Sequence, residues 1–298
     1  MRIAVTGSSG LIGTALVTAL RDRGDDVVRL VRRPPREPGE VRWDPAAGTV
    51  DVEALGGVEA AVNLAGAGVG DRRWDDEYKR TILSSRVDST RTLVKALSAL
   101  DPLPRVLVSA SAVGYYGDRG EEVLTEESGP GTGFLVDVVE AWEDAASPAV
   151  DAGIRVALAR TGLVLSPGGG ALGRLLPLAR LGLAGPLGSG RQWWPWITLD
   201  DHVRAVLHLI DQDGLSGPVN LGSPEPARNL DLTRALGRAL HRPTLVPAPA
   251  FGLRLVLGEF AHEVLASQRM MPARLTASGF TFRHGTPDEA ATWVVHGR

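Results

Sequence analysis

The chain has 298 residues, a length that fits one large domain or two ordinary ones, and 44% of them are apolar, which excludes disorder as the main state. The formal net charge is −3 and the pI is near 6.1, so no overall positive field attracts nucleic acid or anionic lipid. Cysteine is absent, which excludes a disulfide scaffold, thiolate catalysis and cysteine-ligated metal centres.

The N-terminus leads directly from Met1 into a short apolar segment and a glycine-rich turn, without the apolar stretch and cleavage site of a secretory signal. The most apolar later stretch, Leu172 to Leu187, is interrupted by arginines and prolines before it reaches the roughly 20 residues of a membrane-spanning helix. We therefore expect a cytoplasmic protein with a small-molecule substrate and without nucleic-acid or membrane partners. Oligomeric state stays open, and a homodimer is compatible with the sequence.

Short apolar runs alternate with helical patterns through the first half of the chain. The runs predict buried parallel strands, because a strand covered on both faces loses the alternation of polar and apolar residues. Helices are predicted from Leu11 to Leu20, around Val87 to Leu97 and from Phe134 to Ala146, where apolar residues recur three or four positions apart. The predicted strands are Arg2–Val5, Val27–Val31, Ala60–Leu64, Arg105–Ser109 and Arg155–Ala159.

This alternation predicts an α/β fold with a Rossmann-type doubly wound parallel sheet, which binds ligands at the carboxyl ends of its strands. After Leu165 a segment rich in proline and glycine begins, and we expect a helix and loops over the sheet up to Gly190. A helix from Thr198 to Ile210, capped by Thr198 or Asp200, and a strand at Val219–Gly222 follow. We therefore divide the chain into a Rossmann domain, 1–165, to which 196–222 return, and a smaller, mostly helical C-terminal lobe, 166–195 and 223–298.

The turn between the first strand and the first helix contains three glycines, with the spacing G-x-x-G-x-x-G. In a dinucleotide site, Gly7 would permit the tight turn, Gly10 would let backbone N–H groups approach the pyrophosphate, and Gly13 would allow close packing of helix and strand. The position directly after an N-terminal strand favours this interpretation over a turn that only packs. The predicted cofactor contacts are Gly7, Ser9, Gly10, Leu11 and Ile12.

The second strand ends in Arg32 and Arg33, where an NAD site usually carries an acid for the ribose 2′-hydroxyl. Two guanidinium groups there could bind a 2′-phosphate, so the sequence predicts NADP(H), with Arg32 as the preferred contact. The alternative is that one or both arginines are solvated loop residues.

Four segments occur in the order found in extended short-chain dehydrogenases/reductases: Thr6–Gly13, Asn63–Gly66, Ser109–Ser111 leading to Tyr116-Gly117, and Arg160–Leu165. More narrowly, the chain resembles an atypical epimerase-family branch of the NAD-dependent epimerase/dehydratase-like proteins, which has a C-terminal domain of unknown function. The resemblance covers essentially the whole chain. The narrower match is carried by Arg72-Arg73-Trp74, Ser85-Arg86-Val87, Trp142-Glu143, Pro167–Gly170, Trp196-Ile197, Ser267-Gln268-Arg269, Pro272 and Gly279–Phe282.

The resemblance implies further cofactor contacts along the adenosine, the pyrophosphate and the nicotinamide. Small residues at the carboxyl end of a strand leave room for a ligand, which supports the contacts at Leu64, Ala65 and Gly66. For Arg86, the alternative role is that of a surface arginine paired with a nearby acid such as Asp88. The implied contacts are Leu64, Ala65, Gly66, Arg86, Gly162 and Leu163.

Typical members of the class exchange a proton through Tyr-x-x-x-Lys on one helix face, where the lysine lowers the pKa of the tyrosine. This sequence lacks the pair, since alignment on Glu143 puts Leu135 at the tyrosine position and Val139 at the lysine position. The side chains that could replace it lie at the end of the fourth strand and just after it. They are Ser109, Ser111 and Tyr116, with Tyr115 as the alternative tyrosine.

A tyrosine with a pKa of about 10 is roughly 0.1% ionised at pH 7, so its use as a base would add about 4 kcal/mol to the barrier. Donating a proton needs no ionisation, so a catalytic Tyr116 predicts carbonyl reduction with NADPH; the alternative role is packing beside the nicotinamide. We expect an NADP(H)-dependent oxidoreductase or epimerase-like enzyme for a small carbonyl or sugar-like substrate. The alternative is a catalytically silent NADP(H)-binding sensor or partner-binding module.

No metal site is predicted, because the segment that starts at His262-Glu263 resembles H-E-x-x-H but has Ala266 at the second ligand position. The cluster of Trp193, Trp194 and Trp196 either stacks on a substrate or forms a core between the lobes, and the core is favoured.

Overall fold

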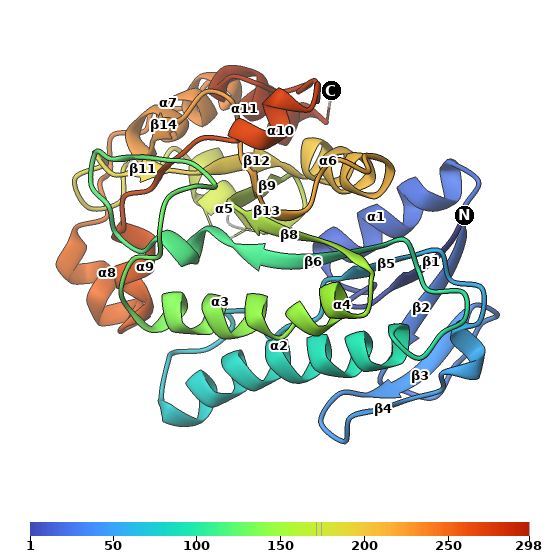
Figure 1. The fold of residues 1–298 in the computed structure, drawn as a ribbon. Coiled ribbons are helices and arrows are strands. Elements are labelled where there is room, and N and C mark those ends of the chain that lie inside the picture. Colours follow the sequence, from blue (N-terminus) through green and yellow to red (C-terminus); the bar gives the residue numbers. More distant parts are fainter. Residues whose placement is uncertain (171, 174, 298) are drawn as a thin grey trace.

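The computed structural model describes residues 1–297 except 171 and 174, and its centre is an eight-stranded sheet (Figure 1). The strand order is β13-β8-β6-β5-β1-β2-β3-β4, and all neighbours are parallel except β3 and β4. The predicted Rossmann-type parallel sheet is therefore confirmed. The strands are β1 (Arg2–Val5), β2 (Asp26–Val31), β3 (Glu40–Asp44), β4 (Thr49–Val50), β5 (Ala60–Asn63), β6 (Val106–Ala112), β8 (Arg155–Thr161) and β13 (Gly217–Leu221).

Helices cover both faces of this sheet (Figure 1). One face carries α2 (Asp76–Leu97), α3 (Phe134–Asp144) and α4 (Ser147–Asp151), and the other carries α1 (Leu11–Asp22) and α6 (Leu199–Asp211). The apolar spacing that predicted these helices places their buried faces on the sheet: Leu16 of α1 packs with Val206 of α6, while Leu93 of α2 packs on the opposite side. Two short 3₁₀ turns, η1 (Glu53–Leu55) and η2 (Val113–Tyr116), complete this part.

The sequence predicted no strand between Val31 and Ala60, yet β3 and β4 lie there. The physical reason is that β3 is charged at Glu40, Arg42 and Asp44, and its apolar residues, Val41 and Trp43, are too few to form a continuous run. This strand forms the outer part of the sheet, so it does not need the doubly apolar composition of the central strands.

A smaller sheet lies beside the main one. It consists of β9 (Leu163–Ser166), β10 (Gly169–Gly170) and β12 (Trp196–Thr198), and the helix α5 (Leu175–Arg180) lies between β10 and β12 in the chain. The expected helix is present, whereas β9 and β10 were not expected. The predicted cap of α6 is confirmed, because the Thr198 side chain accepts a hydrogen bond from the backbone N–H of Asp201 at 3.2 Å.

The C-terminal part is mostly helical. In Figure 1, α8 and α9 lie beyond the ends toward which the arrows of β6 and β8 point, whereas α7, α10 and α11 lie above β12. Trp194 and Trp196 are buried in its core, which favours the packing role for these two side chains. Residue 298 and the two gaps in 166–195 lie outside the described residues. The elements are α7 (Asn229–Leu240), α8 (Ala250–Leu257), α9 (Phe260–Leu265), α10 (Ala273–Ala277), α11 (Pro287–His296), and the short strands β7 (Val123–Leu124), β11 (Trp193–Trp194), β14 (Ala227–Arg228) and β15 (Arg269–Met270).

The topology fixes where a ligand can bind. From β1 the chain passes to β2 on one side, and it later returns to β5 on the other side of β1. The crevice outside the carboxyl ends of β1 and β5 is therefore the switch point at which open α/β sheets bind their ligands. Within the described residues, no helix has the length and apolar character needed to cross a membrane.

Buried His202 predicts that stability falls on acidification. Its ring lies on α6, bonds the Thr161 hydroxyl at 3.0 Å, and burial lowers its pKa to about 4 from 6.5. The unfolded chain therefore binds one more proton between these pH values, so the stabilisation present above pH 6.5 is lost as the pH falls toward 4, by up to about 3 kcal/mol. Urea unfolding across this range should show a shallower pH slope for His202→Gln than for the wild type. Parallel curves would contradict this prediction.

Candidate functional site

The glycine turn after β1 is shaped by contacts between backbones. Gly7 has φ +62°, and a Cβ atom there would lie 2.6 Å from the carbonyl oxygen of Leu64. A Cβ atom at Gly13 would lie 2.2 Å from the carbonyl oxygen of Gly7. At Gly10 the nearest atom would be 3.4 Å away, an ordinary contact, so the protein's own packing requires Gly7 and Gly13 but not Gly10.

A buried hydroxyl joins this turn to the end of β5. Thr6 Oγ1 accepts hydrogen bonds from the backbone N–H groups of Leu64 at 3.0 Å and Ala65 at 3.2 Å, and it donates to Asn63 Oδ1 at 2.7 Å. The structure therefore brings together two of the predicted segments, the turn and Leu64–Gly66, at the switch point of the sheet.

The first turn of α1 lies open toward the same edge. Its N-cap residue is Gly10, which has no side chain to bond the first N–H groups, and the first turn contains no acid. Ser9 and Gly10 are exposed, while Leu11 and Ile12 are half-buried. The free N–H groups and the positive end of the helix dipole suit an anion at this place.

Arg86 of α2 reaches the other side of the crevice. Its side chain packs against Gly66 and over the Trp142 ring, with Cζ 5.1 Å from the ring centroid, and Nη1 donates to the carbonyl oxygen of Ile82 at 2.9 Å. Burial lowers the pKa of Arg86 to about 10, so the group remains a cation at neutral pH. No described carboxylate forms an ion pair with it, so the alternative pairing with Asp88 is not observed.

Arg32 and Arg33, the two arginines predicted to bind a 2′-phosphate, differ in their contacts. Arg33 is engaged by Glu40, to which it donates two hydrogen bonds of 2.8 and 2.6 Å, and this pairing lowers the pKa of Glu40 to about 2. Arg32 is exposed and forms no ion pair with any described residue. The expectation that both arginines are free to bind a phosphate therefore needs correction, since only Arg32 is uncommitted.

At the end of β6, Ser111 belongs to a buried polar network. Its hydroxyl donates to Glu143 Oε1 on α3 at 2.5 Å, and the Glu143 carboxylate accepts two hydrogen bonds of 2.8 Å from Arg160 on β8. Arg160 lies flat over Tyr115, with Cζ 3.4 Å from the ring centroid. Sequence reasoning missed Glu143 and Arg160 as partners of Ser111, because they lie 32 and 49 residues further along the chain.

Tyr116 fits the proposed proton transfer poorly. Its side chain is fully buried, its hydroxyl donates to Asn220 Oδ1 at 2.7 Å and accepts from Arg160 at 3.2 Å, and burial raises its pKa. These contacts favour the packing role that was left open. Ser109 is also fully buried, and its hydroxyl has no hydrogen-bond partner among the described residues.

The positions that the tyrosine and lysine of the class would occupy are packed with apolar side chains. Leu135 and Val139 of α3 lie over Gly114 of η2, so closely that a Cβ atom there would be 3.3 Å from Leu135 and 3.7 Å from Val139. A Cβ atom at Gly162 would lie 2.6 Å from the carbonyl oxygen of Pro195, so this position has no room for a side chain. The N–H of Gly162 donates to the carbonyl oxygen of Leu221, and the N–H of Leu163 donates to that of Pro195. Gly162 and Leu163 are half-buried, so part of each remains open.

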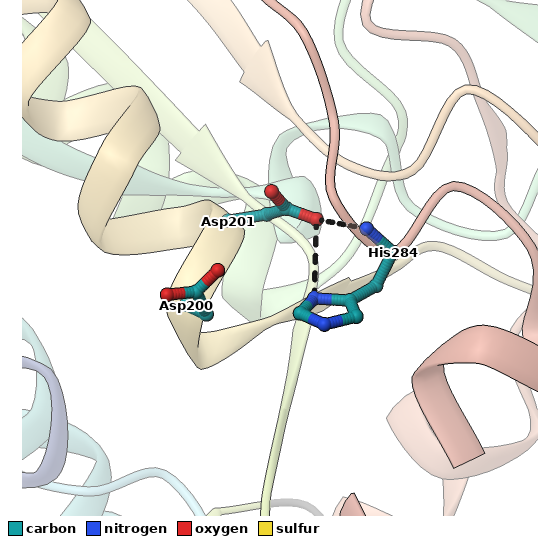
Figure 2. Close-up of side chains that lie close together, drawn as sticks. All are labelled: Asp200, Asp201 and His284. Carbon is teal, nitrogen blue, oxygen red and sulfur yellow. Dashed lines mark hydrogen bonds and ion pairs between the residues drawn. The ribbon is translucent and has the colours of Figure 1, made fainter. Parts of the chain in front are cut away.

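Asp200, Asp201 and His284 are close enough together to suggest a metal site. Figure 2 shows Asp201 contacting both the backbone N–H and the ring of His284, with Asp200 beside them. The Asp201 carboxylate already accepts from the N–H groups of Arg283 and His284, each at 2.9 Å, and from Arg204 at 2.8 Å. With its acceptor positions filled in this way, the cluster anchors the C-terminal segment to α6.

Glu263 on α9 is a second feature that sequence reasoning missed. It is half-buried, forms no hydrogen bond or ion pair with a described residue, and burial raises its pKa, helped by nearby Asp118 and opposed by His262. Its helix packs Phe260 against Gly70 and Trp74, beside the segment that follows Gly66. The only sequence signal was its place in the H-E-x-x-A segment.

Comparisons with known proteins show which family the chain is similar to. Residues 3–222 match the model of the NAD dependent epimerase/dehydratase family, and residues 248–294 match a domain of unknown function. An epimerase family protein of Mycobacterium bovis is 47% identical over 294 residues, which cover 98% of this chain and 97% of the relative. A chloroplastic epimerase family protein of Arabidopsis thaliana is 37% identical over 292 residues, covering 95% of this chain and 84% of that protein.

Two solved structures are similar over nearly the whole chain. The human epimerase family protein SDR39U1 (isoform 2), crystallised with NADPH, has a TM-score of 0.93 and 33% identity, and each chain is covered completely. The nucleoside-diphosphate sugar epimerase of Corynebacterium glutamicum has a TM-score of 0.82 and 37% identity, with 99% of this chain and 58% of that chain covered.

The unpaired carboxyl of Glu263 predicts a variant that is more stable than the wild type. Because its pKa is raised in the folded state, the native protein loses stability as the pH rises above the ordinary value of 4.5. Glu263→Gln should therefore increase the melting temperature at pH 8, and the gain should disappear at pH 4. Exposed Glu140→Gln on α3 serves as the control, and an equal effect of both substitutions would contradict the prediction.

Proposed function

Since this chain belongs to the NAD dependent epimerase/dehydratase family, we propose that it is an NADP(H)-binding oxidoreductase or epimerase-like enzyme for a small carbonyl or sugar-like substrate. The proposal includes a cytoplasmic location, a homodimer as the candidate assembly, and no metal, nucleic-acid or membrane partner. The relative crystallised with NADPH supports the choice of coenzyme by its similarity.

The observation that carries the proposal is Arg86, a half-buried cation beside Gly66 that forms no ion pair with a described residue. Within the described residues, Arg86 has aromatic and backbone contacts but no carboxylate. Burying an uncompensated guanidinium is costly unless an anion joins it. Gly10 supports the same conclusion, because nothing in the protein's own packing demands a glycine there.

The residues along the crevice fit a dinucleotide in order. We assign the pyrophosphate to the N–H groups of Leu11 and Ile12 and to Arg86, with Gly10 leaving room for the ligand and Gly7 and Ser9 shaping the turn; the Gly10 N–H itself donates to the Gly7 carbonyl oxygen at 3.0 Å. Arg32 faces a 2′-phosphate, Leu64–Gly66 lie beside the adenosine, and Gly162 and Leu163 flank the nicotinamide. When bound, the reduced coenzyme supplies a hydride.

For the substrate side we assign Ser111 as the side chain that contacts the reacting oxygen. In the free protein the Ser111 hydroxyl donates a hydrogen bond to Glu143, which Arg160 holds in place, so Ser111 Oγ can accept a hydrogen bond from the hydroxyl of an alcohol substrate. To donate to a carbonyl oxygen, the Ser111 hydroxyl turns away from Glu143, and the proton that a reduction consumes comes from solvent. Tyr116 and Ser109 are fully buried and have packing roles at the carboxyl end of β6. This assignment replaces the expectation that Tyr116 donates the proton.

The second candidate function, a catalytically silent NADP(H) sensor, is favoured by the apolar replacement of the tyrosine and lysine positions. Leu135 and Val139 place neither a phenol nor an ammonium group at these two positions. The C-terminal segment would then present a coenzyme-dependent surface to a partner.

Coenzyme binding distinguishes the two arginines. Arg86→Ala should weaken NADPH and NADH alike, roughly 10- to 100-fold, because the pyrophosphate is common to both. Arg32→Ala should weaken NADPH only. Isothermal titration measures both, and exposed Arg91→Ala on the same helix as Arg86 is the control. Wild-type protein that gives no heat with either coenzyme at millimolar concentration would rule out the proposed function.

Turnover distinguishes the enzyme from the sensor. With NADPH and a panel of aldehydes, ketones and oxidised sugars, we expect loss of absorbance at the reduced nicotinamide band. Ser111→Ala should lower the rate at least about tenfold. Tyr116→Phe should change the rate less than about threefold, but it should destabilise the fold by roughly 1 to 3 kcal/mol because Asn220 loses a partner. Coenzyme that binds but stays unreacted across the panel would favour the sensor.

A further inference from the structure

The chain between β2 and β3 carries charges of both signs. From 29 to 40 it contains four arginines and two glutamates, which are Arg29, Arg32, Arg33, Arg36, Glu37 and Glu40. The structure distributes the ion pairs unevenly, since Glu40 pairs with two of the arginines and Arg32 pairs with no described residue. The charge that this edge presents to a ligand therefore depends on how completely Glu40 is neutralised.

Glu40 is held by several donors at once. Its carboxylate accepts two hydrogen bonds from Arg33 and one of 2.7 Å from the backbone N–H of Arg36, and Arg29 Nη1 lies 3.4 Å away. The Glu40 side chain is only 1% exposed. A carboxylate has about four acceptor positions, so these donors fill it and fix the loop around a buried negative charge.

Glu40 is also connected to the glycine turn. Arg29 pairs with Glu40 in the register of β2 and β3, and its Nε donates to the hydroxyl of Ser8 at 3.2 Å. The carboxylate therefore stands one arginine away from the turn, at the edge where the adenosine ribose of a bound dinucleotide lies. A free acid at this edge would accept the ribose 2′-hydroxyl of NAD and repel the 2′-phosphate of NADP.

We propose that Arg33 favours the 2′-phosphate indirectly: it neutralises Glu40, while Arg32 makes the phosphate contact. Arg33 is then a positioning residue, and Glu40 is a masked acid that would otherwise select NAD. This inference rests on the proposed binding of NADP(H). It differs from a site in which both arginines bind the phosphate. In such a site, a substitution of Glu40 would not restore the affinity for NADPH that is lost with Arg33.

The test is a double-mutant cycle read by coenzyme affinity. Isothermal titration of the full chain with NADPH and with NADH is carried out for the wild type, Arg33→Ala, Glu40→Gln and the double variant. Arg33→Ala should weaken NADPH about tenfold, because an unmasked charge repels the phosphate, while NADH binding holds or improves. The double variant should return to within about twofold of the wild type.

Two matched variants complete the cycle. Arg32→Ala should not be rescued by Glu40→Gln, since its loss removes the contact itself. Glu37→Gln should leave both affinities unchanged, because the Glu37 side chain is 62% exposed, although its carboxylate lies 3.5 Å from Arg29. Binding of NADH by every variant shows that the fold is intact.

If the double variant binds NADPH as weakly as Arg33→Ala and still binds NADH, Arg33 contacts the phosphate directly and the proposal is overturned. A structure of the wild-type complex with NADPH gives an answer that does not depend on variants: Arg33 still bonded to Glu40 supports the proposal, and Arg33 moved onto the phosphate overturns it. Wild-type protein that binds neither coenzyme removes the proposed function, and this inference with it.

Discussion

The hydroxyl of Thr6 holds together the edge on which the whole site is built. It is fully buried, donates once and accepts twice, and so uses every position that a hydroxyl offers. Through it the end of β1 and the end of β5 approach until the backbones of Gly7 and Leu64 touch. Without this contact the glycine turn, the segment after β5 and Arg86 would not face one crevice.

A second buried network lies at the carboxyl end of β6. Arg160 joins Glu143, Ser111 and Tyr116, and Tyr116 continues through Asn220 to the backbone of Met271. The end of β6 is thereby connected to the C-terminal segment by hydrogen bonds. A ligand that displaced Ser111 or Arg160 from Glu143 would have to replace a charge-assisted hydrogen bond in a buried environment, which is costly.

Much of the fold could be predicted from the sequence, because the central strands and the faces of α1, α2 and α6 carry clear apolar patterns. The strands β3 and β4 could not, since a strand near the edge of the sheet with Glu40, Arg42 and Asp44 has no such pattern. The turn was recognisable by its place after β1. The state of Arg33 was not, because only the folded loop brings it onto Glu40. The hydrogen bond of Tyr116 to Asn220 could not be predicted either, because the two residues lie 104 positions apart.

The backbone contacts of the turn have a consequence for how the sequence of such a protein can drift over time. Every side chain at Gly13 collides with the Gly7 carbonyl, and every side chain at Gly7 collides with Leu64, whether or not a ligand is ever bound. A descendant that had lost its coenzyme would therefore keep both glycines to preserve its shape. The backbone contacts of the turn do not require Gly10 or Arg86. Replacement of these two residues, rather than of Gly7 or Gly13, would therefore indicate that a descendant no longer binds the coenzyme.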